Sequence, residues 1–345
     1  MINTLADLSK EILKYRSLAI AGMKKNTGKT ETLNYILSAL KDSRQTIAVT
    51  SIGVDGETTD RVTLTEKPEI VIYKDMLFIT SEKHFALRKM SAEICKISRQ
   101  TTALGRLITA KAALTGKVML SGPADTATLK AVIRQNEQLG AKLTIVDGAL
   151  SRLSLSAPSV TDATILATGA ALSANIPQLV HATKYVCDKI ALPVLENPYY
   201  TLLNPIDNGI WTIDHEGNLA DTGCQSALQV KDIQNILSDK KNIQLLYVAG
   251  AISNDLLSCL CNQKAWKNIV VVVKDFTKIF ADANHFYLFL SKGGQIKVLS
   301  KTKLLAITIN PTSPQGYVLD TQKLQESIFQ AVHIPTFNVR TNDKI

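Results

Sequence analysis

Apolar and polar positions alternate along the first 195 residues in a way that predicts strands and helices in turn. Short apolar or β-branched runs end in polar turns, and most are followed by segments with apolar residues at helical spacing. We expect strands at 18–23, 46–53, 117–120, 142–146 and 162–168, and helices at 31–40, 129–139 and 169–190. Strands that alternate with helices favour a parallel sheet covered on both faces. The predicted fold class is therefore α/β, with a doubly wound, mostly parallel sheet.

Two stretches of this half lack the simple alternation. Residues 69–81 have two apolar halves around a charged turn, which predicts a hairpin. Ser81 is a typical N-cap, and we expect a helical region from there to about Ala113. Inside that region, residues 99–106 are polar and contain a glycine, which suggests an interface or a lid over a site.

A stretch rich in proline and tyrosine at residues 193–205 marks a domain boundary. We expect a first domain over 1–195, a linker over 196–205 and a second, smaller α/β domain over 206–345. The pattern of the second domain predicts a hairpin at 210–222, helices at 228–237 and 254–261, strands at 245–251, 269–274, 286–299 and 304–309, and a closing helix after Asp320.

Length and composition agree with a two-domain globular protein. The chain has 345 residues, which is long for a single core, and it contains 46% hydrophobic and 20% charged residues. No apolar run is long enough to cross a membrane, and the N-terminal residues lack the apolar core of a signal peptide. We therefore expect a cytoplasmic protein without a membrane partner.

The net charge of +9 changes this picture little. Lysine and arginine are spread along the chain without a basic tract and without interleaved aromatic residues, so we expect no nucleic-acid partner. The five cysteines form no C-x-x-C pair, and the five histidines show no ligand spacing. These residues therefore predict no metal site of their own.

The junction between the first strand and its helix carries the clearest chemical signal. The first turn of a helix offers free N–H groups and the positive end of its dipole to a phosphate. Gly28 lets the backbone approach phosphate oxygens, Lys29 neutralises the outer phosphates, and the Thr30 hydroxyl suits Mg²⁺. The residues that we expect to contact the nucleotide are Lys25, Asn26, Thr27, Gly28, Lys29, Thr30 and Glu31.

Acidic residues follow two other predicted strands. Asp55 lies in the loop after strand 46–53, with Asp60 as a second choice, and Asp147 follows strand 142–146 directly. Ligands of open α/β sheets bind at the carboxyl ends of the strands, so we expect these carboxylates beside the phosphate site. Thr30, Asp55 and Asp147 are therefore the candidate Mg²⁺ ligands, and the turn at 121–123 is a weaker candidate for the site.

Lys24 extends this motif to MKKNTGKT. The motif resembles the deviant Walker A loop, x-K-G-G-x-G-K-T, of the P-loop class that includes dethiobiotin synthetase and the ParA and MinD ATPases. The resemblance implies that Lys24 reaches a nucleotide phosphate, often across a homodimer interface, and that Asp55 serves Mg²⁺ or the attacking water. The candidate catalytic residues are then Lys24, Lys29 and Asp55. Lys25 and Asn26 replace the two glycines of that loop, and asparagine tolerates a left-handed backbone better than lysine does.

Four segments extend the resemblance along the chain. AGMKKNTGKTETLN, LSGPADTATLK, TIVDGALSRLSLSAPSVTDATILATGAALS and ITINPTSPQGYVLD look like the P-loop subunit of the lysine 5,6-aminomutase reactivase of lysine-fermenting bacteria. This resemblance implies an ATPase that needs ATP and Mg²⁺ and works with a MutS-like ATPase subunit. Its target would be an adenosylcobalamin-dependent aminomutase.

Two other functions stay open on the sequence alone. The chain has no N-K-x-D motif after a suitable strand, which favours ATP over GTP. A phosphate loop with two carboxylates also fits an ATP-dependent ligase of the dethiobiotin synthetase type, in which ATP activates a substrate carboxylate. It fits equally a regulatory module that senses nucleotide without turning it over.

Overall fold

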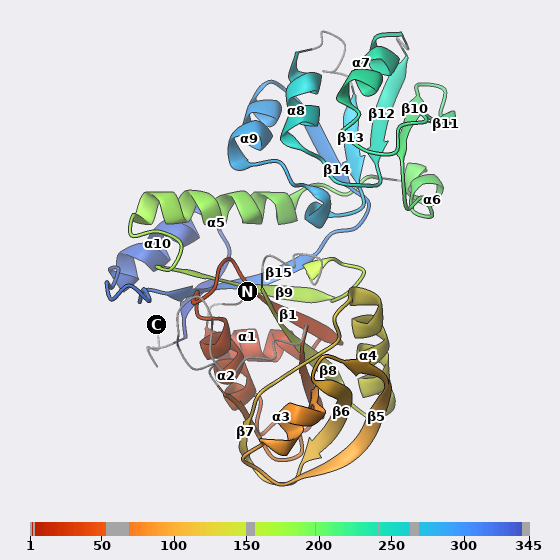
Figure 1. Cartoon of the computed structure of the whole chain (residues 1–345). Helices are drawn as coiled ribbons and strands as arrows, with labels where there is room; N and C mark the ends of the chain where they lie inside the picture. The colour runs from red at the N-terminus through yellow and green to blue at the C-terminus, as the bar shows by residue number, and fades with distance from the viewer. Residues whose placement is uncertain are drawn as a thin grey trace. The chain divides into compact units, whose positions relative to one another are not determined.

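The computed structural model of the chain describes residues 2, 4–52, 69–149, 156–196, 198–239, 242–262 and 269–339. The chain divides into two compact units (Figure 1). Unit 1 comprises Met1–Lys184 and Lys303–Ile345, and unit 2 comprises Tyr185–Thr302. Each unit combines a sheet with helices, so the mixed α/β class is confirmed. None of the helices in the described ranges is long and apolar enough to cross a membrane.

Among the described residues, the main sheet of unit 1 has nine strands in the order β16-β15-β9-β1-β8-β2-β4-β6-β5. Pairing is parallel from β16 to β4, and β6 and β5 are added antiparallel. The strands are β1 (Ser17–Gly22), β2 (Ile47–Ser51), β4 (Leu77–Ser81), β5 (Ala92–Thr102), β6 (Gly105–Ala112), β8 (Leu143–Ala149), β9 (Ala163–Gly169), β15 (Lys303–Asn310) and β16 (Thr336–Asn338). The expected mostly parallel sheet is therefore present.

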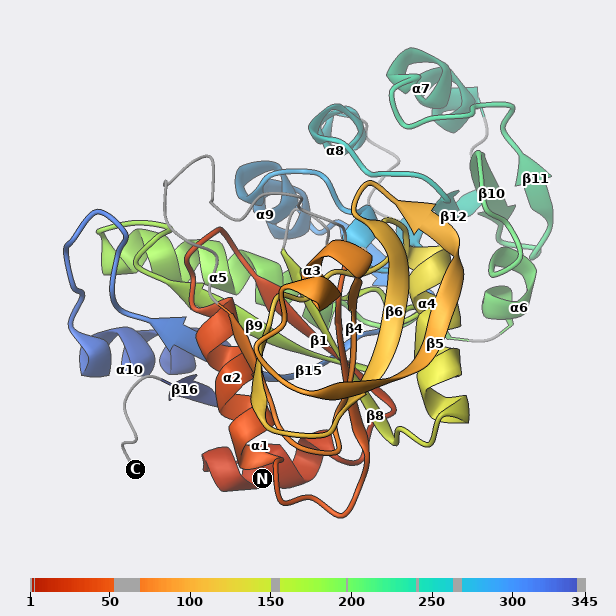
Figure 2. The same cartoon turned by 60° about the horizontal axis from the view of Figure 1, so that its bottom comes forward.

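Helices cover both faces of this sheet. They are α1 (Leu5–Ile12), α2 (Lys29–Ala39), α3 (Glu82–Ala86), α4 (Thr126–Gln138), α10 (Thr321–Val332) and α5 (Ile176–Ala191), the last of which contains the division between the units. Ile145 of β8 packs in the cluster that includes α1 and α2, whereas its neighbour Val146 packs against Leu129 and Ile133 of α4. Successive side chains of a strand point to opposite faces, so α2 and α4 lie on opposite sides of the sheet (Figure 2).

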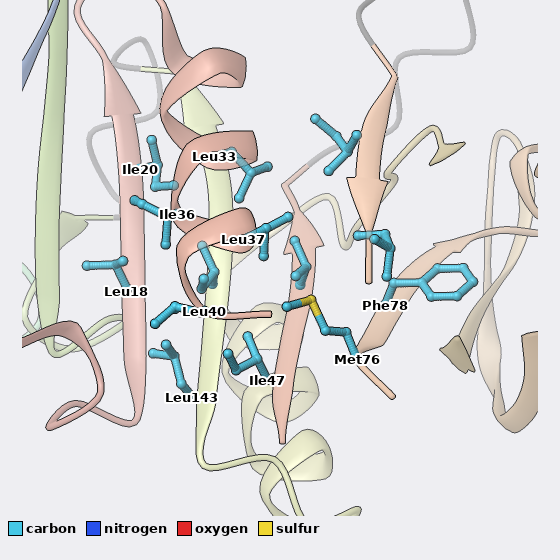
Figure 3. Packing of buried hydrophobic residues seen from close by; sticks show 14 of the residues in the cluster. Leu18, Ile20, Leu33, Ile36, Leu37, Leu40, Ile47, Met76, Phe78 and Leu143 are labelled. Atoms are coloured by element: carbon cyan, nitrogen blue, oxygen red, sulfur yellow. The ribbon is translucent and has the colours of Figure 1, made fainter. Parts of the chain in front are cut away.

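β1 and α2 form as their apolar pattern predicts. All six residues of β1 are buried, as expected for a strand with helices on both faces. Leu33 and Leu37 of α2 lie in the same buried cluster as Leu18 and Ile20 of β1 (Figure 3). Burying each such side chain stabilises the fold by about 1.5–3 kcal/mol. This contact fixes α2 over β1 and thereby holds both ends of the loop between them, residues 23–28.

The predicted hairpin at 69–81 is wrong. Its turn exists, with Asp75 at a φ of 67°, but the two strands on either side do not pair with each other. β3 (Ile70–Ile72) pairs with β7 (Gly116–Val118) in a separate two-stranded sheet, and β4 joins the main sheet beside β2. β4 is buried along its whole length, so it can take a place inside a covered sheet. A local turn does not determine these long-range partners.

The helical region expected from Ser81 to Ala113 is also wrong beyond its first turn. The Ser81 hydroxyl accepts a hydrogen bond from the His84 backbone N–H and caps α3, which ends at Ala86. β5 and β6 then form an antiparallel hairpin, and Gly105 turns the chain with a φ of 91°. Pairing of β6 with β4 decides the conformation here, because strand preference depends strongly on the neighbouring strands.

The C-terminal segment departs from the expected domain division. β15 pairs in parallel with β9, and β16 pairs with β15, so residues 303–338 complete the sheet of unit 1. The sequence suggests a second domain over 206–345 because β15 comes after the elements of unit 2 in the chain, and the sequence does not show that its partner is β9. Unit 2 is instead an insertion in the chain of unit 1, which starts at Tyr185 within α5 and ends at Thr302, just before β15.

Unit 2 contains, among its described residues, a five-stranded sheet in the order β11-β10-β12-β13-β14. Its elements are α6 (Tyr199–Leu203), β10 (Ile210–Asp214), β11 (Leu219–Asp221), α7 (Val230–Asp239), β12 (Ile243–Val248), α8 (Asn254–Cys261), β13 (Val270–Val273), a 3-10 turn η3 (Phe276–Lys278), α9 (Ala283–Ser291) and β14 (Gln295–Val298). β12, β13 and β14 are parallel, and the predicted hairpin at 210–222 is confirmed as β10 and β11.

Two expectations for unit 2 need correction. Residues 196–205 are not a linker, because α6 lies there and Leu203 is fully buried in the core of unit 2. The strand expected over 286–299 is helical in its first part. Asp282 caps α9 by accepting a hydrogen bond from the His285 backbone N–H, and Phe286 and Phe289 are buried at helical spacing.

Candidate functional site

The carboxyl ends of three neighbouring strands bring together several residues that the sequence singles out. β1 leads into residues 23–28, which we call the β1–α2 loop. On β8, Asp147 pairs with Ile20 of β1 on one side and with Ser51 of β2 on the other. Asp147 therefore lies at the same sheet edge as the loop, as predicted. Asp55 and Asp60 lie outside the described residues.

The β1–α2 loop is held by hydrogen bonds at its start and across its middle. The Met23 backbone N–H donates to the Ala167 carbonyl at 2.9 Å, which ties the loop to β9. The Thr27 hydroxyl donates to the Lys24 carbonyl at 2.8 Å, and Thr27 is buried. These bonds fix the path of the chain from β1 to the first turn of α2.

Two residues of the loop have a left-handed backbone. Asn26 has a φ of 62° and Gly28 a φ of 89°. Asparagine adopts this region more readily than other residues with a side chain, and glycine adopts it without penalty. The position of Asn26 therefore suits the turn, and Lys25 does not need the left-handed conformation there. Gly28 is also the N-cap residue of α2 and offers no side chain to its first turn.

Lys29 is directed back over the loop towards β8. Its Nζ lies 2.7 Å from Oδ1 of Asp147, and both side chains are about one-fifth exposed, at 22% and 18%. Gly22 leaves room for this path, because a Cβ there would lie 2.8 Å from Cγ of Lys29 and 2.9 Å from the Thr27 hydroxyl. A cation and a carboxylate thus meet at the carboxyl edge of the sheet.

Two backbone N–H groups of the β1–α2 loop have no protein acceptor. Within the described part of the chain, no group accepts a hydrogen bond from the N–H of Thr27 or Gly28, although both residues are buried. The first N–H groups of α2 also lack a partner inside the helix, as at any helix start. Backbone N–H groups that have no protein acceptor can donate to an acceptor on a ligand.

The remaining predicted nucleotide contacts surround this loop at differing exposure. Lys24, Lys25 and Asn26 are exposed, and Thr30 and Glu31 of α2 are half-buried. The structure thus brings together residues 24–31 and Asp147, the whole of the predicted set that lies in the described ranges. It assigns no role to any of them by itself.

The turn at 121–123 also lies at this edge, next to β2. A Cβ on Gly122 would lie 1.5 Å from the Ser51 carbonyl oxygen, so only glycine fits there. Ser121 is buried, and its hydroxyl lies 2.5 Å from Nδ1 of His84 and 3.3 Å from the Ser81 hydroxyl. These contacts fasten the turn to α3, a role that the spacing of the histidines did not predict.

The segment at 99–106, expected to be an interface or a lid, is also held to its neighbours by hydrogen bonds. The Glu82 carboxylate accepts hydrogen bonds from the Arg106 backbone N–H at 2.8 Å and from its guanidinium at 2.9 Å. These bonds lower the pKa of Glu82 below its ordinary value. The start of β6 is therefore tied to α3.

Asn310 and Thr308 of β15 reach the β1–α2 loop and its helix, and sequence reasoning missed both. Nδ2 of Asn310 donates to the Asn26 carbonyl at 3.1 Å, and the Thr308 hydroxyl lies 2.8 Å from that of Thr32. One signal was available. The run ITIN ends an apolar strand on a polar residue, just as TIVD does at Asp147.

Among the described residues, no three or more His, Cys, Asp or Glu side chains gather in a metal-binding group. No family model matches the sequence, and neither does any curated protein. The geometry of the site therefore carries the functional argument that follows.

Proposed function

We propose that the chain is an ATP-binding P-loop protein whose unit 1 is a doubly wound nucleotide-binding domain. The observation that carries the proposal is the β1–α2 loop itself. Its Thr27 and Gly28 N–H groups have no acceptor among the described residues, and it leads directly into Lys29, the first residue of α2. Donors, a positive charge and a helix N-terminus are the elements that bind a polyphosphate.

The residues at the loop also fit a nucleotide with Mg²⁺. Residues 25–31 would surround the phosphates, with Lys29 neutralising their charge, and Lys24 would supply a second cation. Thr30 and Asp147 offer a hydroxyl and a carboxylate oxygen, which are ligands that Mg²⁺ prefers, and Asp55 is the third candidate. The metal would neutralise phosphate charge during transfer.

For the biological role, we propose an ATPase subunit of a complex that reactivates an adenosylcobalamin-dependent aminomutase of lysine fermentation. The four segments named above support this role, and two of them contain the loop and Asp147. Unit 2 has a core of its own, and we infer that it contacts the MutS-like subunit or the mutase. Such coupling requires that ATP favour one conformation of the complex over another.

Turnover assays separate this role from the two alternatives. The chain is incubated with ATP and Mg²⁺ alone, then with a lysate fraction from its source, then with a panel of small carboxylates. Phosphate release that needs a protein fraction supports the reactivase subunit. Release that needs a carboxylate supports a ligase of the dethiobiotin synthetase type. ATP binding without release in any condition supports a nucleotide-sensing module, and absence of ATP binding contradicts all three.

A homodimer in which Lys24 reaches the partner's nucleotide is a further proposal. Lys24 is exposed, so its side chain is not committed to the core of its own unit. Sedimentation of the parent and of Lys24→Ala, with and without ATP, tests it. The account expects ATP to raise the mass of the parent and not that of the variant.

A further inference from the structure

Asn310 holds the β1–α2 loop from β15, and it lies 284 residues after its partner Asn26 in the chain. Its side chain is buried, with 5% exposure. Nδ2 donates to the Asn26 carbonyl at 3.1 Å, and Oδ1 accepts from the Thr312 backbone N–H at 3.1 Å. Both partners are consistent with one orientation of the amide, because one is an acceptor and the other a donor. The side chain is therefore committed at both ends.

A second hydrogen-bonded path from β15 reaches the other end of the loop. The Thr32 hydroxyl donates to the Gly28 carbonyl at 2.9 Å, which uses its single proton. The Thr308 hydroxyl lies 2.8 Å away, so it must donate to Thr32. Thr32, Thr308 and Gly28 are all buried. β15 thus supports the carbonyls of Asn26 and, through Thr32, of Gly28.

Anchoring a carbonyl also fixes the direction of the next N–H. In a trans peptide the C=O and the N–H point in opposite directions. The Asn26 carbonyl is directed at Asn310, so the Thr27 N–H is turned away from β15. That N–H is one of the donors without an acceptor among the described residues.

We propose that Asn310 is a positioning residue of the phosphate site: by holding the Asn26 carbonyl, it keeps the Thr27 N–H directed at the bound polyphosphate. The proposal rests on the proposed function, because it assumes that a polyphosphate binds at the loop. Asn310 does not need to touch the nucleotide. Close packing supports this arrangement, since a Cβ on Gly28 would lie 2.9 Å from Cβ of Asn310.

The test compares two probes, MgATP and Mg²⁺ with tripolyphosphate, which has no base or sugar. Their dissociation constants are measured by calorimetry for the full chain, for Asn310→Ala and for the control Asn175→Ala. Asn175 is exposed and caps α5 by accepting a hydrogen bond from the Gln178 N–H. Asn175→Ala therefore makes the same substitution at a position that does not contact the β1–α2 loop. The proposal expects Asn310→Ala to weaken both probes by the same factor, about tenfold or more, and the control to stay within about twofold.

Loss of ATP affinity with unchanged tripolyphosphate affinity would overturn the proposal, because Asn310 would then contact the base or sugar directly. Unchanged affinity for both probes would overturn it as well. If the circular dichroism spectrum of Asn310→Ala differs from that of the parent, Thr308→Val is measured in its place. This variant is expected to lose about threefold in affinity for both probes. Unchanged affinity of Thr308→Val for both probes would overturn the proposal. If the parent binds neither probe, the proposed function itself fails, a result distinct from failure of the Asn310 variant.

Discussion

At the scale of single residues, Lys29 and Asp147 form the central pair of the site. They lie 118 positions apart in sequence and 2.7 Å apart in space. Their meeting was predictable, because parallel strands end at one edge, Lys29 follows the loop after β1, and Asp147 lies near the carboxyl end of β8. Asp55 follows the same logic but lies outside the described residues.

We expect Asp147→Asn to separate binding from turnover. The amide keeps the size of the side chain but removes the negative charge that would hold Mg²⁺. MgATP affinity should change by less than about fivefold, while Mg²⁺-dependent phosphate release falls by about a hundredfold or more. Calorimetry and a phosphate-release assay measure the two effects. If Asp147→Asn released phosphate at the parental rate, the proposal that Asp147 binds Mg²⁺ would be contradicted.

Because Lys189 of unit 2 is buried, we expect the free energy of unfolding of unit 2 to depend on pH. Lys189 is buried beside the Tyr185 ring, 4.4 Å from Nζ to the ring centroid, and donates to the Ile279 carbonyl at 3.3 Å. Burial lowers the pKa of Lys189 from 10.5 to about 8, which corresponds to about 3 kcal/mol. The unfolded chain then binds more protons between pH 8 and 10.5, so stability rises with pH across that window. Below pH 8 the cost of the buried charge is present in full.

Lys189→Met should remove that rise. The difference in free energy of unfolding between variant and parent should be largest at pH 7 and shrink as the pH approaches 10. Urea titration followed by tryptophan fluorescence reports unit 2, because both tryptophans lie between residues 185 and 302. Burial also raises the pKa of Tyr185, to about 12, but that residue is shared by both proteins and cancels in the difference. A difference that does not vary with pH would contradict the assignment.

At the scale of elements, the apolar face of α2 holds the site together. Leu37 is fully buried among the strands, and truncating such a residue leaves a cavity. We expect Leu37→Ala to lower the free energy of unfolding of unit 1 by about 2–5 kcal/mol. Leu87→Ala is the control, because Leu87 is 61% exposed. Hydrogen exchange of β1 and α2 peptides measures the effect in unit 1. Equal protection in the two variants would contradict this packing.

Elements with a strong local pattern were predictable, and those decided by long-range pairing were not. β1, α2, α4 and α8 follow from their apolar spacing and capping residues, and Asp125 is the N-cap of α4. The hairpin of β5 and β6 was mistaken for a helix because its stability depends on pairing with β4. Most of α9, from Phe286 onwards, was mistaken for a strand because its run of apolar residues is too dense to show a clear period.

At the scale of the whole molecule, charge is distributed unevenly between the units. Residues 185–302 contain eleven lysines, no arginine and eleven acidic residues, so the net charge of +9 belongs to unit 1. This is the unit with the proposed polyphosphate site. A positive unit raises the local concentration of an anionic ligand and makes its association depend on salt.

The return of the chain to unit 1 leads to a prediction about truncation. A chain that ends at Thr302 lacks β15, whose parallel partner is β9, and also lacks Asn310. We expect faster hydrogen exchange in β9 and β1, loss of MgATP binding, and unchanged exchange in β12 and β13 of unit 2. A longer chain that ends at Asp320 retains β15 and serves as the control. Parental protection of β9 in the shorter chain would contradict the division into these units.

Binding of MgATP to the parent chain and to Lys29→Met tests the central claim most directly. Methionine keeps the length of the side chain and removes its charge, and Lys41→Met makes the same change at an exposed position after α2. Calorimetry should give saturable binding for the parent and Lys41→Met, and an affinity lower by about a hundredfold or more for Lys29→Met. Equal affinity in all three proteins would show that the loop between β1 and α2 is not where the phosphates bind.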